Sequence, residues 1–64
     1  MRLNGLEREC RPGLTLHGLL NELAIDARKV VVMHGDAIYR AGEVPDAPVT
    51  DGDVIEIVTM MQGG

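Results

Sequence analysis

The sequence predicts an α+β domain in which one helix packs across one face of a mixed sheet of four to five strands. Short apolar runs bounded by turn residues indicate strands toward both ends of the 64-residue chain. Between them, four leucines at helical spacing indicate a single helix. A chain of this length forms one domain with a thin core, because it buries only about 60% of the surface that its unfolded form exposes.

The chain opens with a predicted β-hairpin. Asn4-Gly5 separates the short runs Met1–Leu3 and Leu6–Cys10, and Asn-Gly is the strongest local signal for a two-residue hairpin turn. Arg8 interrupts an otherwise apolar face of the second strand. We therefore expect that strand at an edge of the sheet.

A helix is predicted from about Leu16 to Leu23 or Ala24. Arg11-Pro12-Gly13 forms a turn before it, and Thr15 offers a hydroxyl group as the N-cap. The apolar positions follow the i, i+3, i+4, i+7 spacing of one helical face. They are Leu16, Leu19, Leu20 and Leu23.

Two further strands follow the helix. Val30–His34 is a continuous apolar, β-branched run, which is typical of a buried strand. Gly35-Asp36 marks a turn, and Ala37–Arg40 is a short strand after it. Glycine and proline then make Ala41–Val49 an irregular loop.

The last strand is predicted from Val54 to about Met60, directly after the tight turn Asp51-Gly52-Asp53. It is the most apolar strand, so we expect it at the centre of the sheet, paired in parallel with the first strand. We interpret residues 1–60 as the folded domain and residues 61–64 as a flexible C-terminal tail that ends in Gly-Gly.

Composition and charge exclude several classes of function. The net charge is −4 and Tyr39 is the sole aromatic residue, so the basic clusters and stacking platforms of nucleic-acid binding are missing. No apolar run approaches the roughly 18 residues that a membrane span needs, and no signal peptide follows Met1-Arg2. We expect a cytoplasmic protein with no nucleic-acid or membrane partner.

The conspicuous polar residues and the cysteine favour structural roles. Cys10, the single cysteine, cannot form an internal disulfide and is expected to pack in the core. No Cys/His cluster has zinc spacing. We interpret His17 and His34 as structural or solvated residues, and Asp51 and Asp53 as turn-forming residues rather than metal ligands. No catalytic residue and no metal site are predicted.

The candidate functional site is the Gly-Gly end. An α-carboxylate ionises well below neutral pH, so that of Gly64 can attack the α-phosphate of ATP. Glycine has no Cβ, which leaves the reacting carbonyl unshielded and lets the backbone enter a narrow slot. Five extended residues reach roughly 17 Å. That reach would place the carboxylate in another protein's active site, with Met61, Gln62 and Gly63 threading into this partner.

Four features together resemble the ubiquitin-like β-grasp sulfur carriers of the ThiS/MoaD type. They are the Asn4-Gly5 hairpin, the Thr15–Leu20 helix start, the Asp51-Gly52-Asp53 turn and the terminal Gly63-Gly64. The resemblance covers essentially the whole chain. The length favours the thiamine-type carrier ThiS, because the molybdopterin-synthase small subunits (MoaD) are usually longer and richer in aromatic residues.

The resemblance implies a carrier, not an enzyme, with a ubiquitin-like β-grasp fold. In such families an adenylyltransferase of the ubiquitin-activating type uses ATP to adenylate the C-terminal carboxylate, here that of Gly64. Sulfur then replaces AMP and leaves a thiocarboxylate, which thiazole synthase consumes in the thiamine branch. The carrier itself binds no cofactor in this scheme.

Other functions remain open at the level of sequence. The same tail suits a molybdopterin-synthase-type carrier, or a ubiquitin-like modifier that forms an amide with lysines of target proteins. A plain interaction module with an accidental Gly-Gly end is a third alternative. An RNA-binding domain of the same fold fits the acidic charge poorly, and an enzyme is least favoured because no catalytic cluster is present.

Overall fold

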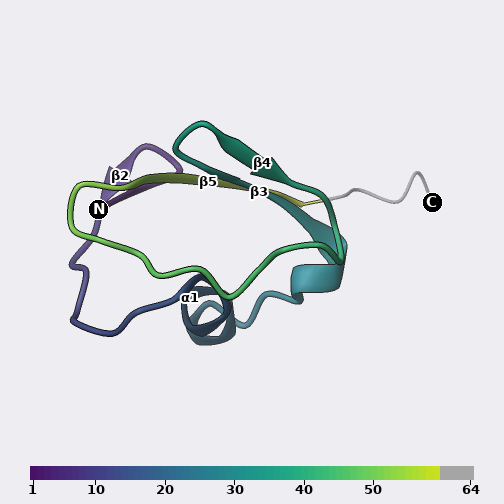
Figure 1. Ribbon diagram of the computed structural model, residues 1–64, viewed down its shortest axis with the longest axis horizontal. Coiled ribbons are helices and arrows are strands. Elements are labelled where there is room, and N and C mark those ends of the chain that lie inside the picture. The colour runs from purple at the N-terminus through teal and green to yellow at the C-terminus, as the bar shows by residue number, and fades with distance from the viewer. Residues whose placement is uncertain (60–64) are drawn as a thin grey trace.

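The computed structural model describes residues 1–59. Strands β1 (Arg2–Leu3) and β2 (Leu6–Glu7) precede helix α1 (Leu16–Glu22), and β3 (Val30–His34), β4 (Ala37–Tyr39) and β5 (Val54–Thr59) follow it. The five strands form one mixed sheet in the order β2-β1-β5-β3-β4, and α1 lies against one side of it (Figure 1). The predicted α+β class, with one helix on one face of the sheet, is confirmed.

Strand β5 occupies the middle of the sheet, as predicted. It runs parallel to β1, with Arg2 opposite Val54 and Leu3 opposite Ile55. On its other side it runs antiparallel to β3 over five residue pairs. The last strand therefore joins the N-terminal hairpin to the second half of the sheet.

The first two strands form the predicted hairpin, with β2 at an edge of the sheet. Asn4 and Gly5 have φ values of 51° and 83°, which is the left-handed pair that a type I′ turn requires and that Asn-Gly tolerates best. The prediction that this strand reaches Cys10 was wrong, because β2 ends at Glu7. The Arg8 N–H still donates to the carbonyl of Met1, but the chain then leaves the sheet toward Val49, whose carbonyl accepts the Cys10 thiol.

The helix begins and ends close to its predicted limits. The Thr15 hydroxyl accepts the Gly18 N–H at 3.1 Å, which confirms Thr15 as the N-cap. At the other end the Ile25 N–H bonds to the Leu20 carbonyl, and Ala24 takes a φ of 58°. This bond is the six-to-one contact of a Schellman end, formed without the glycine that usually allows it.

The prediction missed one short element. Residues Ala27–Lys29 form a single 3₁₀ turn (η1), and the Asp26 carboxylate accepts the Arg28 N–H at its start. Asp26 also pairs with the Arg28 guanidinium, and this contact lowers the pKa of the Asp26 carboxyl to about 2. The turn leads directly into β3.

The core lies between α1 and the covered face of the sheet. Leu16, Leu19 and Leu20 of the helix pack with Val30, Val32, Ile55 and Ile57 of the strands. The loop of residues 41–49 is irregular, as predicted, yet it buries Val44 and Val49 in the same core. It runs along the helix side of the sheet (Figure 1), where the Leu16 N–H donates to Ala47 and the Val49 N–H to Leu14.

The burial of β5 leads to a stability prediction. Ile55 is fully buried, whereas Ile38 of β4 is 68% exposed. Ile55→Ala is expected to lower the free energy of unfolding by about 2–5 kcal/mol, because a buried cavity replaces the lost side chain. Ile38→Ala, the matched control in an exposed position, should cost less than about 1 kcal/mol. Urea unfolding of both variants checks this, and equal losses would contradict the assigned core.

Candidate functional site

The residues predicted to form the site, Met61, Gln62, Gly63 and Gly64, lie outside the described residues, as does Met60. The prediction that residues 61–64 form a flexible tail therefore also concerns residues outside the described part of the chain. The structure does show where this segment is attached. It follows β5, whose last residue, Thr59, is paired with Val30 of β3. The candidate site thus follows the central strand of the sheet in the sequence.

The uncovered face of the sheet, opposite α1, carries exposed apolar side chains on β5 and β4, with half-buried Met33 on β3 between them. In β5, Ile55 and Ile57 point into the core, so Val54 and Val58 point to the other side. They are 50% and 48% exposed. Ile38 of β4 lies on this face too, because it pairs with Met33 and Met33 pairs with Glu56 of β5.

Sequence reasoning did not single out this face. Val54 and Val58 are apolar although they are exposed, so β5 lacks the full alternation that marks a strand with one covered side. Glu56, between Ile55 and Ile57, was the available signal: a charged residue at this position indicates that its side of the strand meets solvent.

The turn before β5 is fixed by the side chain of Asp53. Its carboxylate accepts the Thr50 N–H at 2.9 Å, the Thr50 hydroxyl at 2.8 Å and the His34 Nε2–H at 2.7 Å. These bonds lower the pKa of the Asp53 carboxyl to about 2. The bond from His34 has the largest effect, and the bonds from Thr50 come next. Asp53 is therefore a turn-forming residue, as predicted, and His34 connects the turn to the end of β3.

His17 has a structural contact as well. Its Nε2–H donates to the Val44 carbonyl at 2.6 Å, and its backbone N–H donates to Asp46 at 3.3 Å. The pKa of the Asp46 carboxyl is lowered, mainly by a hydrogen bond from the Thr15 hydroxyl. These contacts hold the loop of residues 41–49 against the start of α1.

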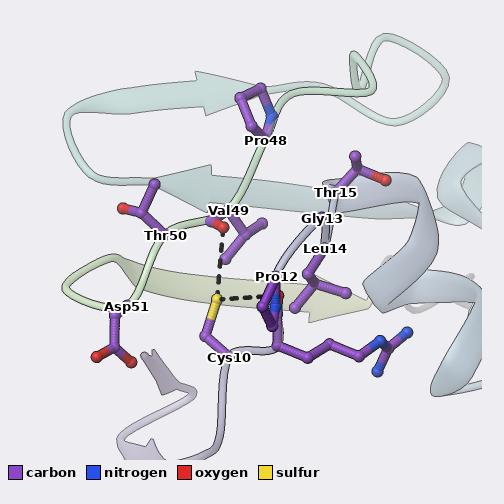
Figure 2. A pocket seen from close by; sticks show the side chains of 10 residues that line it. Cys10, Pro12, Gly13, Leu14, Thr15, Pro48, Val49, Thr50 and Asp51 are labelled. Carbon is purple, nitrogen blue, oxygen red and sulfur yellow. Dashed lines mark hydrogen bonds between the residues drawn. The ribbon is translucent and has the colours of Figure 1, made fainter.

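Cys10 lines an open groove of about 600 Å³ between the segments 10–15 and 48–51. Figure 2 shows its sulfur pointing across the groove to Val49, whose carbonyl accepts the thiol at 3.4 Å. The side chain is half-buried and packs against the core, as predicted. Arg11, at the rim, pairs with Glu22 of α1. The groove therefore joins two loops and brings no second reactive group to the thiol.

Within residues 1–59, no group of three His, Cys, Asp or Glu side chains lies close enough together to hold a metal ion. In that range, too, α1 and the 3₁₀ turn are far too short to cross a bilayer.

A five-stranded mixed sheet with one helix across it, and a central last strand leading to the C-terminus, defines a ubiquitin-like β-grasp protein. Comparison with known proteins identifies the family. The ThiS family model matches residues 1–64, and the chain belongs to the ThiS family. The interpretation as ThiS rather than MoaD is thereby confirmed.

Two relatives carry the comparison further. The chain is 42% identical over 62 residues to the sulfur carrier protein ThiS of Thermus thermophilus, a match that covers 97% of this chain and 95% of that protein. It is 39% identical over 62 residues to a thiazole synthase of Paramagnetospirillum magneticum. The second match covers 97% of this chain but 19% of the synthase, so a region similar to the whole of this domain forms part of a longer synthase chain.

The Asp53 network leads to a prediction about pH. The pKa of the Asp53 carboxyl in the folded protein lies below its ordinary value of 3.8, so the ionised carboxylate stabilises the fold above that value. This stabilisation is lost as the pH falls toward 2. Asp53→Asn is expected to lower the free energy of unfolding by about 1–2 kcal/mol above pH 5. The difference from wild type should shrink between about pH 5 and pH 2.

Urea unfolding at several pH values measures this difference. Asp51→Asn is the matched control, since Asp51 lies in the same turn with its side chain 95% exposed. A loss of stability that is the same at pH 7 and pH 2 would contradict the stabilising role of the Asp53 carboxylate.

Proposed function

We propose that this chain is a sulfur carrier of thiamine biosynthesis whose reactive group is the α-carboxylate of Gly64. The observation that carries the proposal is the match of the ThiS family to all 64 residues, including Gly63-Gly64. The 42% identity to a sulfur carrier protein ThiS over nearly its whole length supports the same role.

The chemistry takes place on the carboxylate and is performed by partner enzymes. A carboxylate oxygen attacks the α-phosphate of ATP, pyrophosphate leaves, and an acyl-adenylate forms. The outer sulfur of an enzyme persulfide then displaces AMP and forms an acyl disulfide with Gly64. A second thiol attacks the enzyme-side sulfur of this bond, a disulfide forms on the partner side, and the thiocarboxylate is released on Gly64. This chain supplies the acyl group, while ATP is bound by an adenylyltransferase of the ubiquitin-activating type. The carrier itself holds no cofactor and catalyses no step.

The proposed tail presents this group. In this proposal residues 61–64 act as a tail, and Met61, Gln62 and Gly63 thread into the partner's active site. Five extended residues after Thr59 reach roughly 17 Å. The folded domain thus stays outside the partner while the carboxylate enters it. All of these steps belong in the cytoplasm, where ATP and the partner enzymes are available.

Thiazole synthase is the proposed acceptor of the sulfur. A thiazole synthase that contains a region similar to this domain is the supporting observation, because two functions joined in one chain act on a common substrate at close range. The same relative favours a sulfur carrier over a modifier of lysines, and the ThiS match favours the thiamine-type carrier over the molybdopterin type.

The uncovered face is the surface we assign to thiazole synthase. Val54 and Val58 lie on β5, the strand that leads to the tail, so a partner that covers them also receives the tail. The exposed side chains of Val54, Val58 and Ile38, together with half-buried Met33 on the strand between, form a larger apolar patch than scattered surface residues do.

The decisive test is the mass of the intact chain. Incubation with the adenylating enzyme, ATP and a sulfur donor is expected to add about 16 Da, the difference between sulfur and oxygen. A variant without Gly64 should gain nothing, and Cys10→Ser should gain as much as wild type because the sulfur is placed on Gly64. An unchanged mass in the presence of an active enzyme would count against the carrier role.

The docking surface has its own test. Val58→Glu is expected to lower the rate at which thiazole synthase consumes the thiocarboxylate by at least about tenfold, because a charge is buried at the interface. Leu6→Glu is the matched control: Leu6 is 71% exposed and pairs with Leu3 on the helix side of the sheet. If both variants react equally, the uncovered face is not the contact surface.

A further inference from the structure

The side chain of Asn4 makes a contact that the hairpin itself does not need. Asn4 is the first residue of the turn between β1 and β2, with a φ of 51°. Its Oδ1 atom accepts the backbone N–H of Ile57 at 2.8 Å. Ile57 lies 53 residues later in the chain, near the end of β5. The turn residue is thus bonded to the strand that precedes the tail.

This contact continues the pairing of β1 with β5. The Arg2 N–H donates to the Asp53 carbonyl, and the Asn4 N–H donates to the Ile55 carbonyl, each at 2.9 Å. In an evenly spaced parallel ladder, the Ile57 N–H would bond next to the backbone carbonyl of Asn4. The chain leaves the strand direction at Asn4, and the side-chain carbonyl oxygen stands in the place of the backbone one.

The contact matters because of where β1 ends. Beyond Ile55, β5 continues to Thr59 and is paired with β3 on one side as far as Val30. On the side of β5 that faces β1, the Ile57 N–H donates to the Asn4 side chain, and this is the hydrogen bond that residues 1–59 provide on this side of β5 beyond Ile55. The last residues of β5 are therefore held from both sides only as far as Asn4 reaches.

We propose that Asn4 is a positioning residue, whose side chain fixes the end of β5 and thereby the point from which the tail departs. This inference rests on the proposed function, in which a partner enzyme takes up the Gly64 carboxylate. If the end of β5 is free to move, more residues must be ordered when the tail enters the partner, and binding weakens. The carboxylate chemistry itself is unaffected once the tail is bound.

Two substitutions separate the turn from the contact. Asn4→Gly keeps a residue that adopts a positive φ at no cost, so the hairpin remains, but the acceptor atom is lost. Asn4→Asp keeps an acceptor oxygen at the same place and also tolerates the left-handed conformation. Asn21→Asp, on the exposed side of α1, controls for the added negative charge.

The first measurement is amide hydrogen exchange of Ile57. Loss of one hydrogen bond is expected to speed exchange at this amide about fivefold or more in Asn4→Gly, with little change in Asn4→Asp. The second is the KM of the adenylating enzyme for the carrier, with kcat measured alongside. For Asn4→Gly we expect a KM about tenfold higher than that of wild type, with kcat within about twofold of wild type. For Asn4→Asp we expect the KM to return to the wild-type value.

The outcomes separate this inference from the proposed function. A wild-type chain that gains no sulfur overturns the carrier role, and the positioning role falls with it. If wild type gains sulfur and Asn4→Gly shows an unchanged KM, or a loss that Asn4→Asp does not recover, only the positioning role is overturned. Unchanged exchange at Ile57 in Asn4→Gly overturns the contact itself.

Discussion

The pairing of β5 between β1 and β3 is the constraint on which the rest of the molecule depends. It joins residues from both ends of the chain, since β1 begins at Arg2 and β5 ends at Thr59. It places Ile55 and Ile57 over the leucines of α1, where most of the core is formed. The same alternation turns Val54 and Val58 toward the uncovered face. One strand thus supplies the core, an exposed apolar surface and the attachment of the tail.

Much of this arrangement could be predicted because local signals and tertiary packing agree. Asn4-Gly5 defines the hairpin, Thr15 caps the helix, and the four leucines mark the helical face that the core needs. The run of apolar residues in the last strand indicated its central position, which the pairing with β1 and β3 confirms.

The remaining features depend on contacts that a sequence pattern does not encode. Strand β2 ends where the chain turns toward Val49, and the contact of Cys10 with Val49 spans 39 residues. After α1 ends at Glu22, Ala24 takes a left-handed conformation without the glycine that would have marked this helix end. The bond from Asn4 to Ile57 spans 53 residues, and the pattern Asn-Gly reads the same whether or not the side chain has a distant partner.

The small size of the domain is consistent with the proposed reaction at the Gly64 carboxylate. The core is used to hold one helix on one sheet, and the polar groups with clear roles, such as Asp53 with His34 and His17 with Val44, stabilise turns and loops. A reactive group at the end of the central strand needs no cavity of its own, because a partner can supply the pocket. What the domain must supply is a defined point of departure for the tail. In this fold that point is set where β5 outlasts β1, which is the place that the Asn4 side chain reaches.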